Sequence, residues 1–221
     1  MDEVYEYCVR MLGAGAVAIH ASHEAFVTGR DDRLERLAGA VQACRTRAEE
    51  AAATTDDDDR GSGQTTLAES VAREVAAAAS KLPSEQREAL ALADLVGLSH
   101  EEIARALAID PETAGLLVAR ARLALRAARR GVAAEPDEAC DQRGRALAII
   151  VRRQDHEPVD VDDQTWLLEH LGSCESCARV HASMLEASVC YRAWRTPDPA
   201  ATRPGARPRQ TAEDAVGDAV P

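Results

Sequence analysis

Apolar residues recur at helical spacing in three parts of the chain, and no stretch alternates in the manner of a β-strand. These parts are residues 1–49, 67–130 and 131–195. Between the first two, residues 50–66 are acidic and rich in Gly, Ser and Thr, which predicts a flexible linker. Residues 196–221, rich in Pro, Arg and Asp, predict a disordered tail. The sequence therefore predicts an all-α protein built from small helical domains.

Composition supports small helical bundles in an intracellular protein. Hydrophobic residues make up 46 % of the chain and aromatic residues only 3 %, and alanine, which supplies much of this content, favours helix and fills little core volume. The net charge of −12 argues against a general nucleic-acid coat, although the charge is uneven along the chain. With no membrane span and no signal peptide in the sequence, we expect a cytoplasmic protein. In that compartment its six cysteines are more typical of thiols, metal ligands or redox sensors than of disulfides.

Helix-turn-helix signals follow one another within residues 81–130. A first helix is predicted to end at Gly97, and Ser99 with Glu102 forms a capping box that opens the second. After a short turn, Pro111 stands at the first position of a third helix, where its missing N–H costs nothing. This order predicts a unit whose last helix enters the major groove of DNA. Composition alone fits equally well three packed helices with a solvated arginine face.

The third helix predicts how DNA would be contacted. We expect its first turns to meet bases and its basic residues to meet phosphates, with Glu112, Thr113 and Gly115 in the first group and Arg120, Arg122 and Arg126 in the second. Apolar and small residues follow Thr113, so few side chains remain to read base edges.

Two segments of the sequence resemble the fourth conserved region of the sigma-70 family, especially in its small extracytoplasmic-function members. These segments are LPSEQREALALADLVGLSHEEIARAL and DPETAGLLVARARLALR. The resemblance implies a transcription factor that contacts the −35 element of promoter DNA while another domain binds core RNA polymerase. It does not imply an enzyme, and the sequence holds no nucleophile elbow, phosphate loop or paired-carboxylate motif.

Residues 1–49 resemble, in degenerate form, the region 2 helices with which sigma factors bind core polymerase. Residues 24–26 match that segment, whereas His20 and His23 stand where an acid and a glutamine are usual. The next helix has no tryptophan, although the family uses aromatic residues there to capture unstacked bases. A helical hairpin that merely packs on the rest of the protein explains this segment equally well.

A cysteine and histidine cluster lies near the C-terminus. In the segment WLLEHLGSCESC, the residues His170, Cys174 and Cys177 are spaced as H-x3-C-x2-C, and Cys140 lies thirty residues before the histidine. Four nitrogen and sulfur ligands suit a structural zinc ion. Two other residues are weaker alternatives for the fourth ligand: His156 and His181. The opposing interpretation is that these are incidental thiols.

The same spacing, over residues 138–195, resembles the zinc-binding anti-sigma domain, in which the metal holds three or four short helices together. That domain usually belongs to a separate protein that clamps a sigma factor, and here it would be fused behind the sigma-like domain. We expect Cys190 to be a spare thiol that could take part in redox sensing. The predicted core of this part is Trp166, Leu167, Leu168, Val180, Met184, Leu185, Tyr191 and Trp194.

Two functions follow from these patterns. The first is a sigma-70-like factor that binds core RNA polymerase and promoter DNA and is regulated in cis by intramolecular docking of the zinc domain, either as an inhibitor or as an aid. The alternative is a degenerate sigma-like interaction protein that binds polymerase or another sigma factor without recognising a promoter.

Overall fold

The computed structural model describes most of the chain, namely residues 3–29, 32–53, 67–133 and 140–194. All regular structure in these residues is helical, which confirms the predicted all-α class. The tail prediction, and the linker prediction for residues 54–66, concern residues outside this description.

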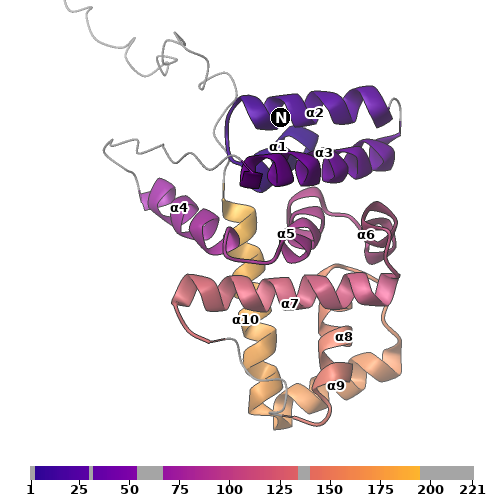
Figure 1. Ribbon diagram of the computed structural model, residues 1–221. Helices are drawn as coiled ribbons and strands as arrows, with labels where there is room; N and C mark the ends of the chain where they lie inside the picture. Colours follow the sequence, from indigo (N-terminus) through magenta and orange to yellow (C-terminus); the bar gives the residue numbers. More distant parts are fainter. Residues whose placement is uncertain (1–2, 30–31, 54–66, 134–139, 195–221) are drawn as a thin grey trace, which may run out of the picture.

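Three helices form the N-terminal part: α1 (Glu3–Leu12), α2 (Ala16–Gly29) and α3 (Arg33–Ala53). The last of them runs beyond residue 49, into the segment whose composition predicted a linker. Helices α2 and α3 approach each other closely at Gly29, where a Cβ atom would lie 2.4 Å from the backbone nitrogen of Arg36. Figure 1 shows these helices side by side at one end of the molecule.

The middle part contains the predicted helix-turn-helix. Its elements are α4 (Leu67–Ala79), α5 (Ser84–Ala91), the π-helical turn η1 (Leu92–Val96), α6 (His100–Leu107) and α7 (Pro111–Arg130). Leu90, Ile103 and Leu125 are fully buried where these elements meet. The N-terminal helices pack directly on this part, and Arg45 of α3 forms two hydrogen bonds, of 2.9 and 2.6 Å, with the buried carboxylate of Glu88.

The C-terminal part consists of α8 (Arg143–Gln154), α9 (Val161–Ser173) and α10 (Glu175–Ala193). In Figure 1, α7 crosses the middle of the molecule, with the N-terminal helices on one side and α8 and α9 on the other. The orange helix α10 crosses behind α7 and runs from the neighbourhood of α9 to the N-terminal helices. One hydrophobic core runs through all three parts.

Two of the residues predicted for the C-terminal core are exposed instead. Leu167 and Met184 are buried as expected, but their neighbours Leu168 and Leu185 are 61 % and 43 % exposed. Each exposed leucine follows a buried one directly, and adjacent positions on a helix point about 100° apart, so only one of the two reaches the core.

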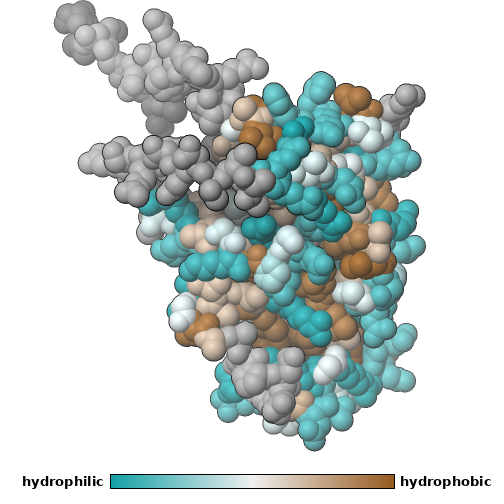
Figure 2. Space-filling view, viewed as in Figure 1, coloured by the Kyte–Doolittle hydropathy of each residue, from teal (hydrophilic) through white to brown (hydrophobic). Residues whose placement is uncertain are grey.

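None of the helices in the described residues is long and apolar enough to cross a membrane. On the face shown in Figure 2, hydrophobic residues reach the surface in separate places among hydrophilic ones. The most exposed large apolar residues lie on three different helices, namely Val27, Val161 and Val189.

Candidate metal centre and helix-turn-helix surface

The caps predicted for the helix-turn-helix are present. Ser99 accepts a hydrogen bond from the backbone N–H of Glu102, whose carboxylate accepts one from the backbone of Ser99 in return. Gly97 ends the preceding turn at φ +76°, a conformation that favours glycine. Asp110 caps α7 in front of Pro111 by accepting from the backbone N–H of Thr113 at 2.8 Å. These local interactions begin α6 at His100 and α7 at Pro111.

The first turns of α7 offer little to a base edge in this arrangement. Glu112 and Thr113 are exposed, but the Thr113 hydroxyl donates to Asp110 at 2.5 Å. Hydrogen bonds from Thr113, first from its side chain and then from its backbone, lower the pKa of Asp110. Gly115 is buried, and a Cβ atom there would lie 2.8 Å from Nδ1 of His100. Of the three residues expected to meet bases, two are therefore accessible and one is covered.

Arg122, expected to contact phosphate, is instead fully buried between two carboxylates. Its guanidinium lies 2.9 Å from Asp94 of η1 and 2.5 Å from Asp155 at the C-terminal end of α8. Burial lowers the pKa of Arg122, but the two carboxylates outweigh this and raise it. The residue lies on the face of α7 that turns toward η1 and α8, so in this arrangement no phosphate reaches it.

Arg122, Asp94 and Asp155 belong to a larger polar network that includes side chains of α6 and α10. Asp155 also accepts from Nε2 of His100 at 2.9 Å. Asp94 accepts from the Ser188 hydroxyl at 2.5 Å and from Arg192 at 3.0 Å, both on α10. The network thus links α6, α7, α8 and α10 through side chains that are mostly excluded from water, where such interactions are strong.

A second set of arginines on α7 shares a single carboxylate of α10. Glu186 lies 3.3 Å from Arg126, 3.4 Å from Arg129 and 2.6 Å from Arg130. Hydrogen bonding to Arg130 is the main cause that lowers the pKa of Glu186. Arg120, on the other hand, is exposed. Of the three expected phosphate contacts, Arg120 is accessible, Arg126 is paired and Arg122 is covered.

The four predicted metal ligands lie together. The ligand atoms of Cys140, His170, Cys174 and Cys177 are all within 4.8 Å of one another, and the Cys140 sulfur is 3.6 Å from Nε2 of His170. Sulfur ligands around a tetrahedral zinc ion, with bonds of about 2.3 Å, lie roughly 3.7 Å apart. The cluster therefore fits such an ion after small side-chain movements. His156 and His181, the weaker alternatives, do not belong to it.

Three separate segments supply these ligands. Cys140 precedes α8, His170 lies in the last turn of α9, and Cys174 and Cys177 stand at the start of α10. The backbone N–H of Cys177 lowers the pKa of the Cys174 thiol, whereas burial raises the pKa of Cys177 to about 12. A bound cation favours the thiolate form of both, so metal binding would displace protons.

An aromatic ring packs against His170, and a guanidinium packs against that ring; neither group belongs to the cysteine and histidine cluster. Trp166 stacks on the imidazole with ring centroids 4.8 Å apart, and the Arg145 guanidinium lies 4.1 Å from the centroid of the Trp166 ring. Because this stack restricts the plane of the imidazole, it would hold His170 in one orientation for a bound metal.

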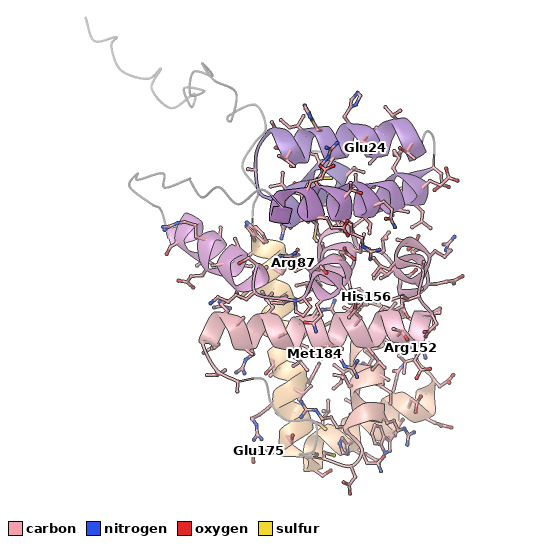
Figure 3. All side chains as sticks on the ribbon, viewed as in Figure 1. Glu24, Arg87, Arg152, His156, Glu175 and Met184 are labelled. Atoms are coloured by element: carbon pink, nitrogen blue, oxygen red, sulfur yellow. The ribbon has the colours of Figure 1, made fainter. Side chains whose placement is uncertain are left out.

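A groove of about 900 Å³ lies between the helix-turn-helix and the end of α8. It is rich in acidic residues, and Arg152 and His156 lie at its α8 side (Figure 3). His156 adopts φ +59°, where the chain turns sharply after α8. This turn brings Asp155 and Glu157 against His100. The first turns of α7 thus face the carboxylates of the turn after α8 as well as solvent.

Sequence reasoning missed the acidic partners of the arginines. Asp94, Asp155 and Glu186 show no local pattern that predicts their role, because each contacts residues at least 28 positions away along the chain. The only signal was general: a run of arginines on a helix in an acidic protein needs counter-charges.

Comparison with known proteins supports the helix-turn-helix assignment. Residues 72–125 match the family model described as Sigma-70, region 4, which covers less than half of the chain. Searches of curated proteins and of solved structures found no match. The matched segment runs from α4 into α7 and includes both capped helices described above. The chain therefore carries a sigma-70 region 4 domain at residues 72–125, which belongs to a DNA-binding and not an enzymatic family.

Proposed function

We propose that the protein is a sigma-like transcription factor of the extracytoplasmic-function type that acts in the cytoplasm on core RNA polymerase and promoter DNA. Its region 4 domain is held in a masked state by its own C-terminal helices, which act as an anti-sigma-like module fused in cis. The observation that carries this proposal is the pairing of Glu186 with Arg126, Arg129 and Arg130.

The masking has a simple electrostatic basis. A carboxylate beside three guanidinium groups stands where a DNA phosphate would bind. The pairs are partly buried, since the Arg126 and Arg129 side chains are 31 % and 22 % exposed, so salt screens them less than fully exposed pairs. DNA must displace Glu186 before its phosphates reach these residues. The C-terminal helices therefore act as an inhibitor in this arrangement.

Zinc is the metal that best suits the cluster of Cys140, His170, Cys174 and Cys177. Three thiolates and one imidazole fill a tetrahedron with protein ligands, which is the arrangement of a structural site with no position left for a catalytic water. When bound, the ion cross-links the segments before α8, at the end of α9 and at the start of α10. It would thereby hold α10, and with it Glu186, against α7.

One observation favours the second function, a sigma-like interaction protein that reads no promoter. At the start of α7 the exposed residues include Asp110 and Glu112, and Gly115 is covered by His100. Negative charges there repel phosphates, and few polar side chains remain for base edges. The two functions differ in sequence preference, because only the first predicts tighter binding to one promoter than to mixed-sequence DNA once the arginines are free.

The masking predicts that Glu186→Gln strengthens DNA binding by the full chain. We expect several-fold tighter binding to a mixed-sequence duplex at low salt, and a steeper salt dependence, because the freed arginines release counterions from the phosphates. Fluorescence anisotropy over a salt series measures both quantities.

Glu169→Gln is the matched control, since Glu169 is an exposed residue of α9 and its loss changes the net charge by the same amount. It should bind DNA as the parent does. An equal gain in both variants would mean that overall charge, and not the contact with α7, limits binding, and the masking proposal would then fail.

A further inference from the structure

Helix α10 is placed to contact every other part of the molecule. It begins directly after Cys174, carries Cys177 in its first turn, pairs with α7 through Glu186, and ends against α1. Its nineteen residues span about 28 Å. Figure 3 marks this course, with Glu175 at its first residue and Met184 where it passes behind α7.

Arg10 of α1 binds the C-terminal end of this helix. Its Nη1 donates to the Tyr191 carbonyl at 2.9 Å and its Nη2 to the Trp194 carbonyl at 2.5 Å. The guanidinium carbon also lies 4.6 Å from the centroid of the Tyr191 ring and 4.5 Å from that of the Trp194 ring. The two rings meet edge to face with centroids 5.7 Å apart. We call these three residues the Arg10 clamp.

The groups around the Arg10 guanidinium favour a cation at this position. The last carbonyls of a helix lack the usual N–H partner four residues further on and carry partial negative charge, which a guanidinium neutralises while it donates hydrogen bonds. The two aromatic faces take the place of hydrating water around the charge. Arg10 is only 8 % exposed, so if the end of α10 moved away, it would lose groups that compensate its burial.

We propose that the Arg10 clamp couples the N-terminal helices to α10, so that the metal centre at the far end of α10 governs them together with region 4. This inference rests on the proposed masking by the C-terminal helices. Helix α10 carries Glu186 and Tyr191 and ends directly before Trp194, and one face of it is buried, with Val180, Met184 and Tyr191 along that face. A shift of α10 therefore affects both contacts at once.

The competing arrangement is that region 4 alone holds the N-terminal helices. Arg45 pairs with the buried Glu88 of α5, and Arg33 donates to the backbone carbonyl of Val96 at 3.1 Å. If these contacts were sufficient, α1 would stay in place when α10 is released. The two arrangements thus predict different protection of α1 from hydrogen exchange.

Hydrogen–deuterium exchange on the zinc-loaded full chain tests the coupling. In Arg10→Gln, peptides of α1 and of the last turns of α10 should exchange at least several-fold faster than in the parent. Trp194→Leu, which attacks the contact from the other side, should do the same, and Arg10→Lys should lie between. Arg47→Gln is the matched control, because Arg47 of α3 pairs only on the surface with Glu24 and Glu50 among the partners seen. It should leave α1 as in the parent.

Removal of zinc supplies the second arm. Chelation of zinc from the parent should speed hydrogen exchange in α1 as well as in α8, α9 and α10. In Arg10→Gln, where α1 already exchanges faster, chelation should speed the exchange of α1 little further. Any of three results would overturn the coupling. The first is unchanged exchange of α1 in both Arg10→Gln and Trp194→Leu, and the second is faster exchange after chelation that is confined to α8, α9 and α10. The third is a parent protein that binds no zinc. Failure of Glu186→Gln to strengthen DNA binding would instead overturn the masking, and with it the control of region 4. The exchange of α1 would still report whether the Arg10 clamp couples the N-terminal helices to α10.

Discussion

Loss of the metal should unfold the C-terminal helices while region 4 keeps its own secondary structure. The metal ligands come from three segments, namely Cys140, His170, and Cys174 with Cys177. Without the metal, α9 has only one fully buried apolar residue, Leu167, to pack it against the other helices. Structural zinc sites supply on the order of 10 kcal/mol of binding free energy, which is folding free energy where no site exists in the unfolded chain. We expect Cys177→Ser to lower the unfolding free energy of this part by at least several kcal/mol.

Metal analysis and thermal unfolding, followed by circular dichroism, measure this effect. Cys190→Ser is the matched control, because Cys190 lies on the same helix but outside the ligand cluster and contacts Arg129 instead. It should keep about one zinc ion per chain and the stability of the parent. The assignment would be refuted if Cys177→Ser retained the full metal content, or if the reduced parent bound none.

The metal-bound form should also be sensitive to acid. The pKa of Cys177 is about 12 without a metal because the thiol is buried, so binding depends on displacement of its proton by the ion. Protons compete more strongly as the pH falls, and zinc affinity should fall with them. A zinc titration at several pH values measures the protons released.

Local sequence patterns predicted the helix ends and the ligand cluster well. Ser99 with Glu102, and Pro111 after its capping residue, act within a few positions of one another, so the sequence contains the whole interaction. The spacing of His170, Cys174 and Cys177 is equally local. Only the distant ligand Cys140 required a choice among alternatives, and the structure brings it into the cluster.

The roles of the arginines on α7 were not predictable in this way. Arg122 and Arg120 are two positions apart in one helix, yet one is fully buried and the other is exposed. The difference arises from Asp94 and Asp155, which tertiary packing brings to one face of α7. The π-helical turn that carries Asp94 also has no sequence signal that we identified. An arginine-rich helix indicates counter-charges but does not say whether DNA or the protein itself provides them.

Asp155→Asn should be among the most destabilising single substitutions in the chain. The carboxylate accepts from Arg122 and from Nε2 of His100, and its side chain is only 5 % exposed. Removing one partner of a buried ion pair costs about 3–5 kcal/mol, because the remaining charge is left uncompensated. Asp94 would still pair with Arg122, so we expect a loss near the lower end of that range, measured by chemical denaturation at neutral pH.

Asp163→Asn provides the matched comparison, because Asp163 pairs with Arg145 on the surface, where an ion pair contributes about 0–1 kcal/mol. The pH dependence gives a second readout. Burial raises the pKa of Asp155, but hydrogen bonds from His100 and Arg122 outweigh burial and hold it below its ordinary value. Its contribution is therefore complete above the unfolded pKa of about 3.9 and is lost as the pH falls through the lower folded value. The parent should lose stability over that acidic range more steeply than Asp155→Asn does. Equal losses from the two Asn variants at neutral pH, or parallel acid profiles of the parent and Asp155→Asn, would show that the network joining region 4 to the C-terminal helices contributes little to their docking.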